Sequence, residues 1–185
     1  MIGPSQKRSL IWAMVHVAGI AGLVALATTA RVQGQEDAGQ VAETASEAFA
    51  LNCFSPFMTA ARAAEVLEAP GVRVDFYDLD PFSDAAPSPV TGRAATTGTD
   101  RRCEVAFDGE YGDFAASAAV AGLEAEGIRT EAPIPDRYRP TEGTALLGAR
   151  QLNPRRVAVV HVGTRPGPNG IETFLLVERL MPIAP

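Results

Sequence analysis

Residues 144–180 read TALLGARQLNPRRVAVVHVGTRPGPNGIETFLLVERL. Three apolar runs in this stretch predict three β-strands, at 144–152, 157–163 and 171–180. An Asn-Pro pair follows the first run, and a Pro- and Gly-rich segment follows the second. These residue types tolerate the backbone angles that turns require. The short connections between the runs predict an antiparallel meander.

Two further strands and two helices are predicted upstream of the meander. Alternating apolar and polar residues predict strands at 72–77 and 102–108. Apolar residues at helical spacing predict helices at 56–68, where Ser55 is the expected N-cap, and at 113–127, where a glycine ends the helix. The predicted fold is therefore α+β: a two-layer arrangement with an antiparallel sheet of about five to six strands and two or three helices on one face.

The spacing also predicts which face of each helix is buried. In the helix at 56–68, Phe57 and Leu67 lie on the apolar face. In the helix at 113–127, Phe114 begins an apolar stripe that continues through alanines. We expect both faces to pack against the sheet.

Residues 43–53 fit two kinds of secondary structure. Apolar residues recur at helical spacing from Val41 to Cys53, which favours a helix. Phe49, Leu51 and Cys53 also alternate, which is typical of a strand. As a strand, the segment would give a ferredoxin-like βαββαβ core followed by a C-terminal hairpin. In that alternative, the strands that carry the two cysteines would be neighbours.

The N-terminal segment has the charge order of a secretory leader. Lys7 and Arg8 precede an uncharged apolar stretch at 10–30, and small residues suited to cleavage follow. The stretch is also long enough to span a bilayer. Residues 1–30 are therefore expected to act either as a cleaved signal peptide or as a membrane anchor. Both alternatives place the remainder outside the cytoplasm, in the periplasm or the extracellular space.

The remainder of the chain is long enough for one domain. Residues 31–40 are polar and predict a flexible tether, and residues 41–185 predict a single globular α+β domain. Residues 81–100 lack a periodic apolar pattern and predict a mobile surface loop. Because the formal net charge is −6, no nucleic-acid partner is expected. Membrane contact is expected only through the N-terminal segment.

The chain contains two cysteines, Cys53 and Cys103. In an oxidising compartment paired thiols persist as disulfides, so we predict a bridge between them. Two buried free thiols are the alternative. The spacing lacks the CxxC pattern of redox sites, and two cysteines with one histidine do not make a zinc site. We therefore expect no metal ion and no cofactor.

His161 is the candidate general base, because it is the one histidine of the predicted domain. A hydrolase would need this side chain beside a carboxylate such as Asp75 or Glu104. No GxSxG motif supplies a nucleophile in the sequence. A structural histidine that shares a sheet face with neighbouring valines is the alternative.

Two arginine doublets are candidates for anion binding: Arg101-Arg102 and Arg155-Arg156. Each doublet precedes a predicted strand. If the two strands run parallel, the doublets can form one anion-binding edge, whereas as antiparallel neighbours they lie far apart. Local ion pairs with the surplus carboxylates are the alternative.

These patterns favour an exported, non-catalytic binding or accessory domain, because the sequence shows no cluster of nucleophile, base and acid. An envelope protein is the expected partner. The alternative is a small envelope hydrolase that uses His161 with a nearby carboxylate. A concave site that holds His161 beside a carboxylate would favour the hydrolase, and His161 packed under a helix would favour the binding domain.

Overall fold

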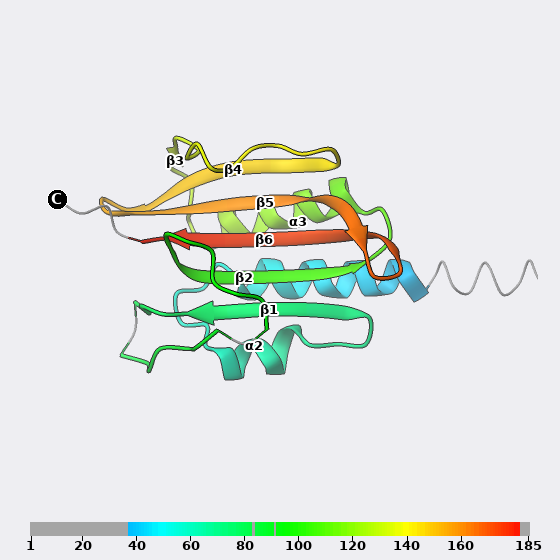
Figure 1. Cartoon of the computed structure of the whole chain (residues 1–185), viewed down its shortest axis with the longest axis horizontal. Helices are drawn as coiled ribbons and strands as arrows, with labels where there is room; N and C mark the ends of the chain where they lie inside the picture. The colour runs from blue at the N-terminus through cyan, green and yellow to red at the C-terminus, as the bar shows by residue number, and fades with distance from the viewer. Residues whose placement is uncertain (1–36, 83, 91, 182–185) are drawn as a thin grey trace, which may run out of the picture. The chain divides into compact units, whose positions relative to one another are not determined.

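The computed structural model describes residues 37–82, 84–90 and 92–181 (Figure 1). The predicted leader at 1–30 lies outside the described residues. Six strands form one open antiparallel sheet in the order β1-β2-β6-β5-β4-β3. Their bounds are β1 Val72–Asp78, β2 Thr99–Asp108, β3 Glu131–Ala132, β4 Thr144–Asn153, β5 Arg156–Gly167 and β6 Gly170–Leu180. The predicted α+β class is confirmed.

The C-terminal meander forms half of this sheet. β5 pairs with β4 on one side and with β6 on the other, and the tight β5–β6 turn brings Gly167 opposite Gly170. β6 then pairs with β2, where Val177 lies opposite Cys103. Because β6 is antiparallel to both β2 and β5, those two strands run in the same direction and begin at the same end of the sheet.

Three helices cover one face of the sheet: residues 37–52, α2 (Ala60–Leu67) and α3 (Gly112–Ala125). Figure 1 shows them behind the sheet, with the β1–β2 connection crossing in front. The hydrophobic core fills the space between helices and sheet, and Phe49, Phe107 and Leu175 in it are fully buried. Among the described helices, none is long and apolar enough to cross a membrane.

The segment that fitted two secondary structures is helical. Residues 43–52 belong to the first helix, and Cys53 lies in the turn that follows it. Ala45 and Phe49 are buried, whereas Leu51 is 65% exposed, which is the burial period of a helix and not of a strand. The ferredoxin-like alternative is therefore wrong. Residues 37–40 of the predicted tether also lie in this helix.

The helix predicted at 56–68 begins later than expected. Ser55 caps a local turn through a hydrogen bond from the Phe57 amide (3.3 Å), and the helix starts only at Ala60. Its N-cap is Thr59, whose hydroxyl accepts a hydrogen bond from the Arg62 amide (3.3 Å). The prediction that Phe57 is buried is wrong, because its side chain lies before the helix and is 73% exposed.

The predicted stop of α3 is confirmed, but its predicted buried stripe is displaced by one residue. Ala115 and Ala119 face the core, and Phe114 is 48% exposed. Gly127 adopts a φ of +69°, and the Ile128 amide donates to the Leu123 carbonyl (2.9 Å). This is the glycine-terminated helix end that the sequence predicted.

The predicted disulfide joins Cys53 to Cys103, with a Cα–Cα distance of 5.6 Å. Cys53 follows the first helix and Cys103 lies in the middle of β2, so the bridge links the helix layer to the sheet. Both cysteines are buried within the core. The predicted inward orientation of Cys103 is confirmed.

Candidate functional site

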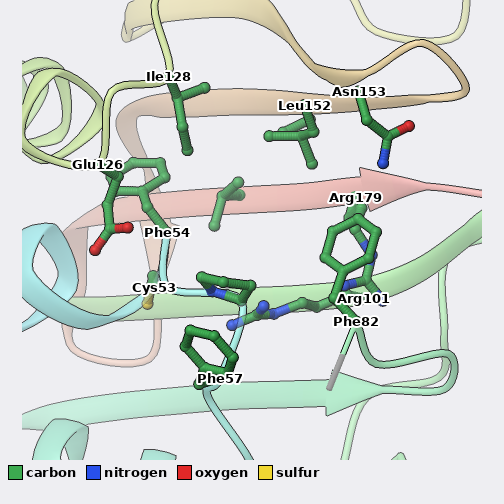
Figure 2. A pocket seen from close by; sticks show the side chains of 13 residues that line it. Cys53, Phe54, Phe57, Phe82, Arg101, Glu126, Ile128, Leu152, Asn153 and Arg179 are labelled. Atoms are coloured by element: carbon green, nitrogen blue, oxygen red, sulfur yellow. The ribbon is translucent and has the colours of Figure 1, made fainter. Parts of the chain in front are cut away.

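A pocket of about 410 Å³ opens on the helix-covered face, at the end of the sheet where β2 and β5 begin (Figure 2). We call it the helix-face pocket. This volume is typical of small-molecule sites, which span about 300–1,000 Å³. Its apolar wall residues are Phe54, Pro56, Phe57, Phe82, Ile128, Leu152, Ala158 and Val177. Cys53, Arg101, Glu126, Asn153 and Arg179 complete the lining.

Strand alternation places the two arginines of this pocket among core residues. Arg101 is on the same face of β2 as Cys103, and Arg179 is on the same face of β6 as Val177. The two arginines are direct cross-strand partners. Like charges placed opposite one another destabilise a sheet unless carboxylates compensate them.

Asp78 and Asp100 provide this compensation. Asp78 lies opposite Arg101 in the β1–β2 register, and its Oδ1 accepts a hydrogen bond from Nη2 of Arg179 (2.6 Å). A β-bulge between Thr99 and Arg101 leaves Asp100 outside the regular pairing, and its Oδ1 accepts from Nε of Arg179 (2.6 Å). Both carboxylates are at most 2% exposed, so Arg179 is held by two buried ion pairs.

Arg101 is buried without a comparable partner. Its side chain is 7% exposed, and the nearest carboxylate oxygen, Oδ2 of Asp78, lies 3.7 Å from Nε, beyond hydrogen-bond distance. Within the described residues, Nε and Nη2 of Arg101 and Nη1 of Arg179 have no hydrogen-bond partner. Such buried donors are rare in folded proteins and require an explanation.

Burial shifts the pKa values of the acids and bases of this site in opposite directions. It lowers the pKa of Arg101 to about 10, and the charge of Arg179 acts in the same direction. The Arg101 guanidinium therefore remains positively charged at neutral pH. Burial raises the pKa of the Asp100 carboxyl, whereas the hydrogen bond and charge of Arg179 lower it.

Aromatic side chains border the charged part of the pocket. Figure 2 shows the Arg101 side chain extending along β2 toward Phe57, while Phe82 lies over Arg179 at the opposite end. The guanidinium carbon of Arg179 is 4.6 Å from the centre of the Phe82 ring, within the range of a cation–π contact. Glu126 lies on the Phe54 side of the pocket, away from Arg179.

The structure separates the members of the two predicted doublets. Arg101 and Arg156 are both buried at the sheet end where β2 and β5 begin, and both are ion-paired to the cluster of buried aspartates. Arg102 points to the opposite sheet face, where it pairs with Asp75 and Glu178. Arg155 lies in the β4–β5 turn and is exposed.

His161 lies outside the helix-face pocket. It points to the sheet face that the helices do not cover, where its Nε2 hydrogen-bonds the Thr144 hydroxyl (3.0 Å) and its ring packs edge-on against Phe174 (5.0 Å). Burial lowers the pKa of His161, and Arg165 adds to this effect while Glu104 opposes it. The structure therefore places His161 neither in this pocket nor under a helix.

The carboxylates expected beside His161 are ion-paired with arginines. Asp75 pairs with Arg93 and Arg102, and Glu104 pairs with Arg93 and Arg165. These pairs belong to a network across the open face in which positive and negative groups alternate. No hydrogen bond joins either carboxylate to His161 within the described residues.

Substituting glutamine for His161 is expected to reduce the acid sensitivity of the fold. Because the pKa of His161 is lowered in the folded protein, the unfolded chain binds the proton more readily. The free energy of unfolding of the wild type should therefore fall as pH drops from about 6.5 through the lowered pKa. Urea unfolding at about pH 7.5 and about pH 5 measures this loss. An equal loss in His161→Gln would contradict the prediction.

Sequence reasoning did not place Arg179, Asp78 and Asp100 in a common site. A signal for Arg179 was present, because Leu175, Val177 and Arg179 alternate along one strand and the first two are core residues. The β-bulge that turns Asp100 toward Arg179 has no comparable pattern in the amino-acid sequence.

Among the described residues, no group of three histidine, cysteine, aspartate or glutamate side chains has the arrangement of a metal site. The chain matches no protein family, no curated protein and no solved structure.

Proposed function

We propose that this protein is a non-catalytic binding domain that works outside the cytoplasm and takes its ligand in the helix-face pocket. The observation that carries the proposal is the combination of apolar walls with buried, unpartnered arginine donors. Ligand sites are typically apolar cavities in which a few polar groups fix the orientation of the ligand.

The disulfide supports the proposed location. Disulfides persist in oxidising compartments and are rare in the cytosol. The Cys53–Cys103 bridge, together with the predicted leader, therefore supports export to the periplasm or the extracellular space. An envelope protein partner remains a further proposal.

The pocket is tested with N-phenylnaphthylamine, a neutral fluorophore that brightens in apolar sites. We expect to recover the protein from the extracytoplasmic fraction with both cysteines resistant to alkylation. The recovered protein should bind the probe. Phe57→Ala should weaken binding roughly fivefold, because bound probe would cover this exposed ring. Fluorescence titration of the two proteins gives the ratio.

Phe114→Ala is the matched control. Phe114 is also an exposed phenylalanine, but it lies on α3 and does not line the pocket. Its removal should leave probe affinity unchanged. Absence of probe binding, or equal binding by both variants and the wild type, would overturn the proposed site. Recovery of the chain from the cytosol with both thiols free would overturn the proposed location.

A further inference from the structure

The helix-face pocket contains buried hydrogen-bond donors of Arg101 that have no acceptor among the described residues. A buried donor that has lost its water without gaining a hydrogen bond destabilises the folded protein. Three such N–H-bearing nitrogens lie at this sheet end: Nε and Nη2 of Arg101 and Nη1 of Arg179. A ligand that accepts from them would remove this unfavourable contribution.

The carboxylate oxygen nearest to Arg101 does not satisfy its donors, because Oδ2 of Asp78 lies 3.7 Å from Nε and has no hydrogen-bond partner of its own among the described residues. Arg179 binds one oxygen of Asp78 and one of Asp100, and Arg156 lies 3.2 Å from the second oxygen of Asp100. A third carboxylate, Asp80, bonds Arg156 and is 61% exposed. Three guanidinium groups therefore lie among three carboxylates, and Arg101 is the one whose carboxylate contact, at 3.7 Å, exceeds hydrogen-bond distance.

The walls determine what else the ligand must contain. Phe54, Ile128 and Leu152 lie opposite Arg101 in Figure 2, and Phe57 flanks it. A small hydrated anion would leave this apolar surface exposed to water. An anion with a hydrocarbon body would cover it and would gain the free energy of apolar burial.

We propose that the helix-face pocket binds a monocarboxylate with an apolar body, whose carboxylate accepts hydrogen bonds from Arg101 and whose hydrocarbon part lies against Phe57, Ile128 and Leu152. The inference rests on the proposed function. The planar guanidinium fork matches the two oxygens of a carboxylate. One guanidinium with free donors compensates the single charge of a carboxylate better than the two charges of a phosphate monoester.

The head-group preference is measured by displacing N-phenylnaphthylamine with decanoate, decanol, decylammonium and decyl phosphate. These compounds share one hydrocarbon body and differ in the head. A hydrogen bond to a charged group contributes about 1.5–3 kcal/mol, so decanoate should bind at least about tenfold more tightly than decanol. Decylammonium should bind most weakly, because it would meet Arg101.

Arg101→Met should remove the preference for decanoate over decanol, because methionine retains apolar volume but has no donors. Arg101→Lys, which keeps the charge without the planar fork, should retain part of the preference. Arg155→Met is the matched control, since Arg155 is exposed and does not line the pocket.

Equal displacement by decanoate and decanol, or a preference that survives in Arg101→Met, would overturn the inference and leave the proposed site intact. Tighter binding of decyl phosphate than of decanoate would overturn the carboxylate assignment. Failure of the neutral probe to bind would instead overturn the proposed function itself.

Discussion

Arg179→Met is expected to lower the free energy of unfolding by about 3–5 kcal/mol, because removing one partner of a buried ion pair leaves an uncompensated charge in the interior. Arg179 hydrogen-bonds both Asp78 and Asp100 at 2.6 Å, and all three side chains are at most 3% exposed. Without Arg179, two carboxylates lose their closest partner. Urea unfolding followed by circular dichroism measures the change.

Arg101→Met provides the matched comparison. Arg101 lies on the same sheet face as Arg179 and is similarly buried, but its nearest carboxylate oxygen is 3.7 Å away. Removing it eliminates a buried cation that makes no hydrogen bond to a carboxylate, so stability should stay within about 1 kcal/mol of the wild type or increase. Equal destabilisation by both substitutions would show that Arg101 is a structural ion-pair partner and would contradict our description of the pocket.

Removing the disulfide is expected to lower the free energy of unfolding by about 4 kcal/mol. The bridge closes a sequence separation of 50 residues, and on the chain-entropy model a loop of this length gives roughly that value. A typical domain has a net stability of about 5–15 kcal/mol. The Cys53→Ala/Cys103→Ala double variant should therefore unfold at a much lower urea concentration than the oxidised wild type.

The control for this measurement is the wild type kept fully reduced, which has the same thiols without the bridge. Both the reduced protein and the double variant should be destabilised relative to the oxidised protein. Comparable stability of all three would mean that the bridge adds nothing beyond the packing of two buried side chains. That outcome would contradict the prediction.

The strands were predictable because their signals are local. Alternation at Cys103, Val105 and Phe107 identified the inward face of β2, and turn-forming residues delimited the meander. The start of α2 was mispredicted because Ser55 and Pro56 suit both a helix N-terminus and a tight turn. The long-range packing of Phe54 and Met58 into the core accompanies the turn, and no local pattern encodes it.

The pocket was only partly predictable. The doublets drew attention to Arg101 and Arg156, and the condition for their proximity, that their strands run parallel, is met because β6 lies between β2 and β5. Arg179 belongs to that intervening strand, so its role depends on a pairing between residues distant in sequence. Phe57 and Phe82 lie in connecting segments, where no periodic hydrophobic pattern indicates which side chains line a pocket.

β6 is the last of the described strands to be synthesised, and it pairs with both β2 and β5. A growing chain that has not reached residue 180 therefore has two separate parts, β1–β2 and β3–β4–β5, and no continuous sheet. Each part would present an unpaired inner edge, and the two-stranded β1–β2 part would by itself be marginally stable at best in water. Folding therefore waits until synthesis of the described domain is nearly finished.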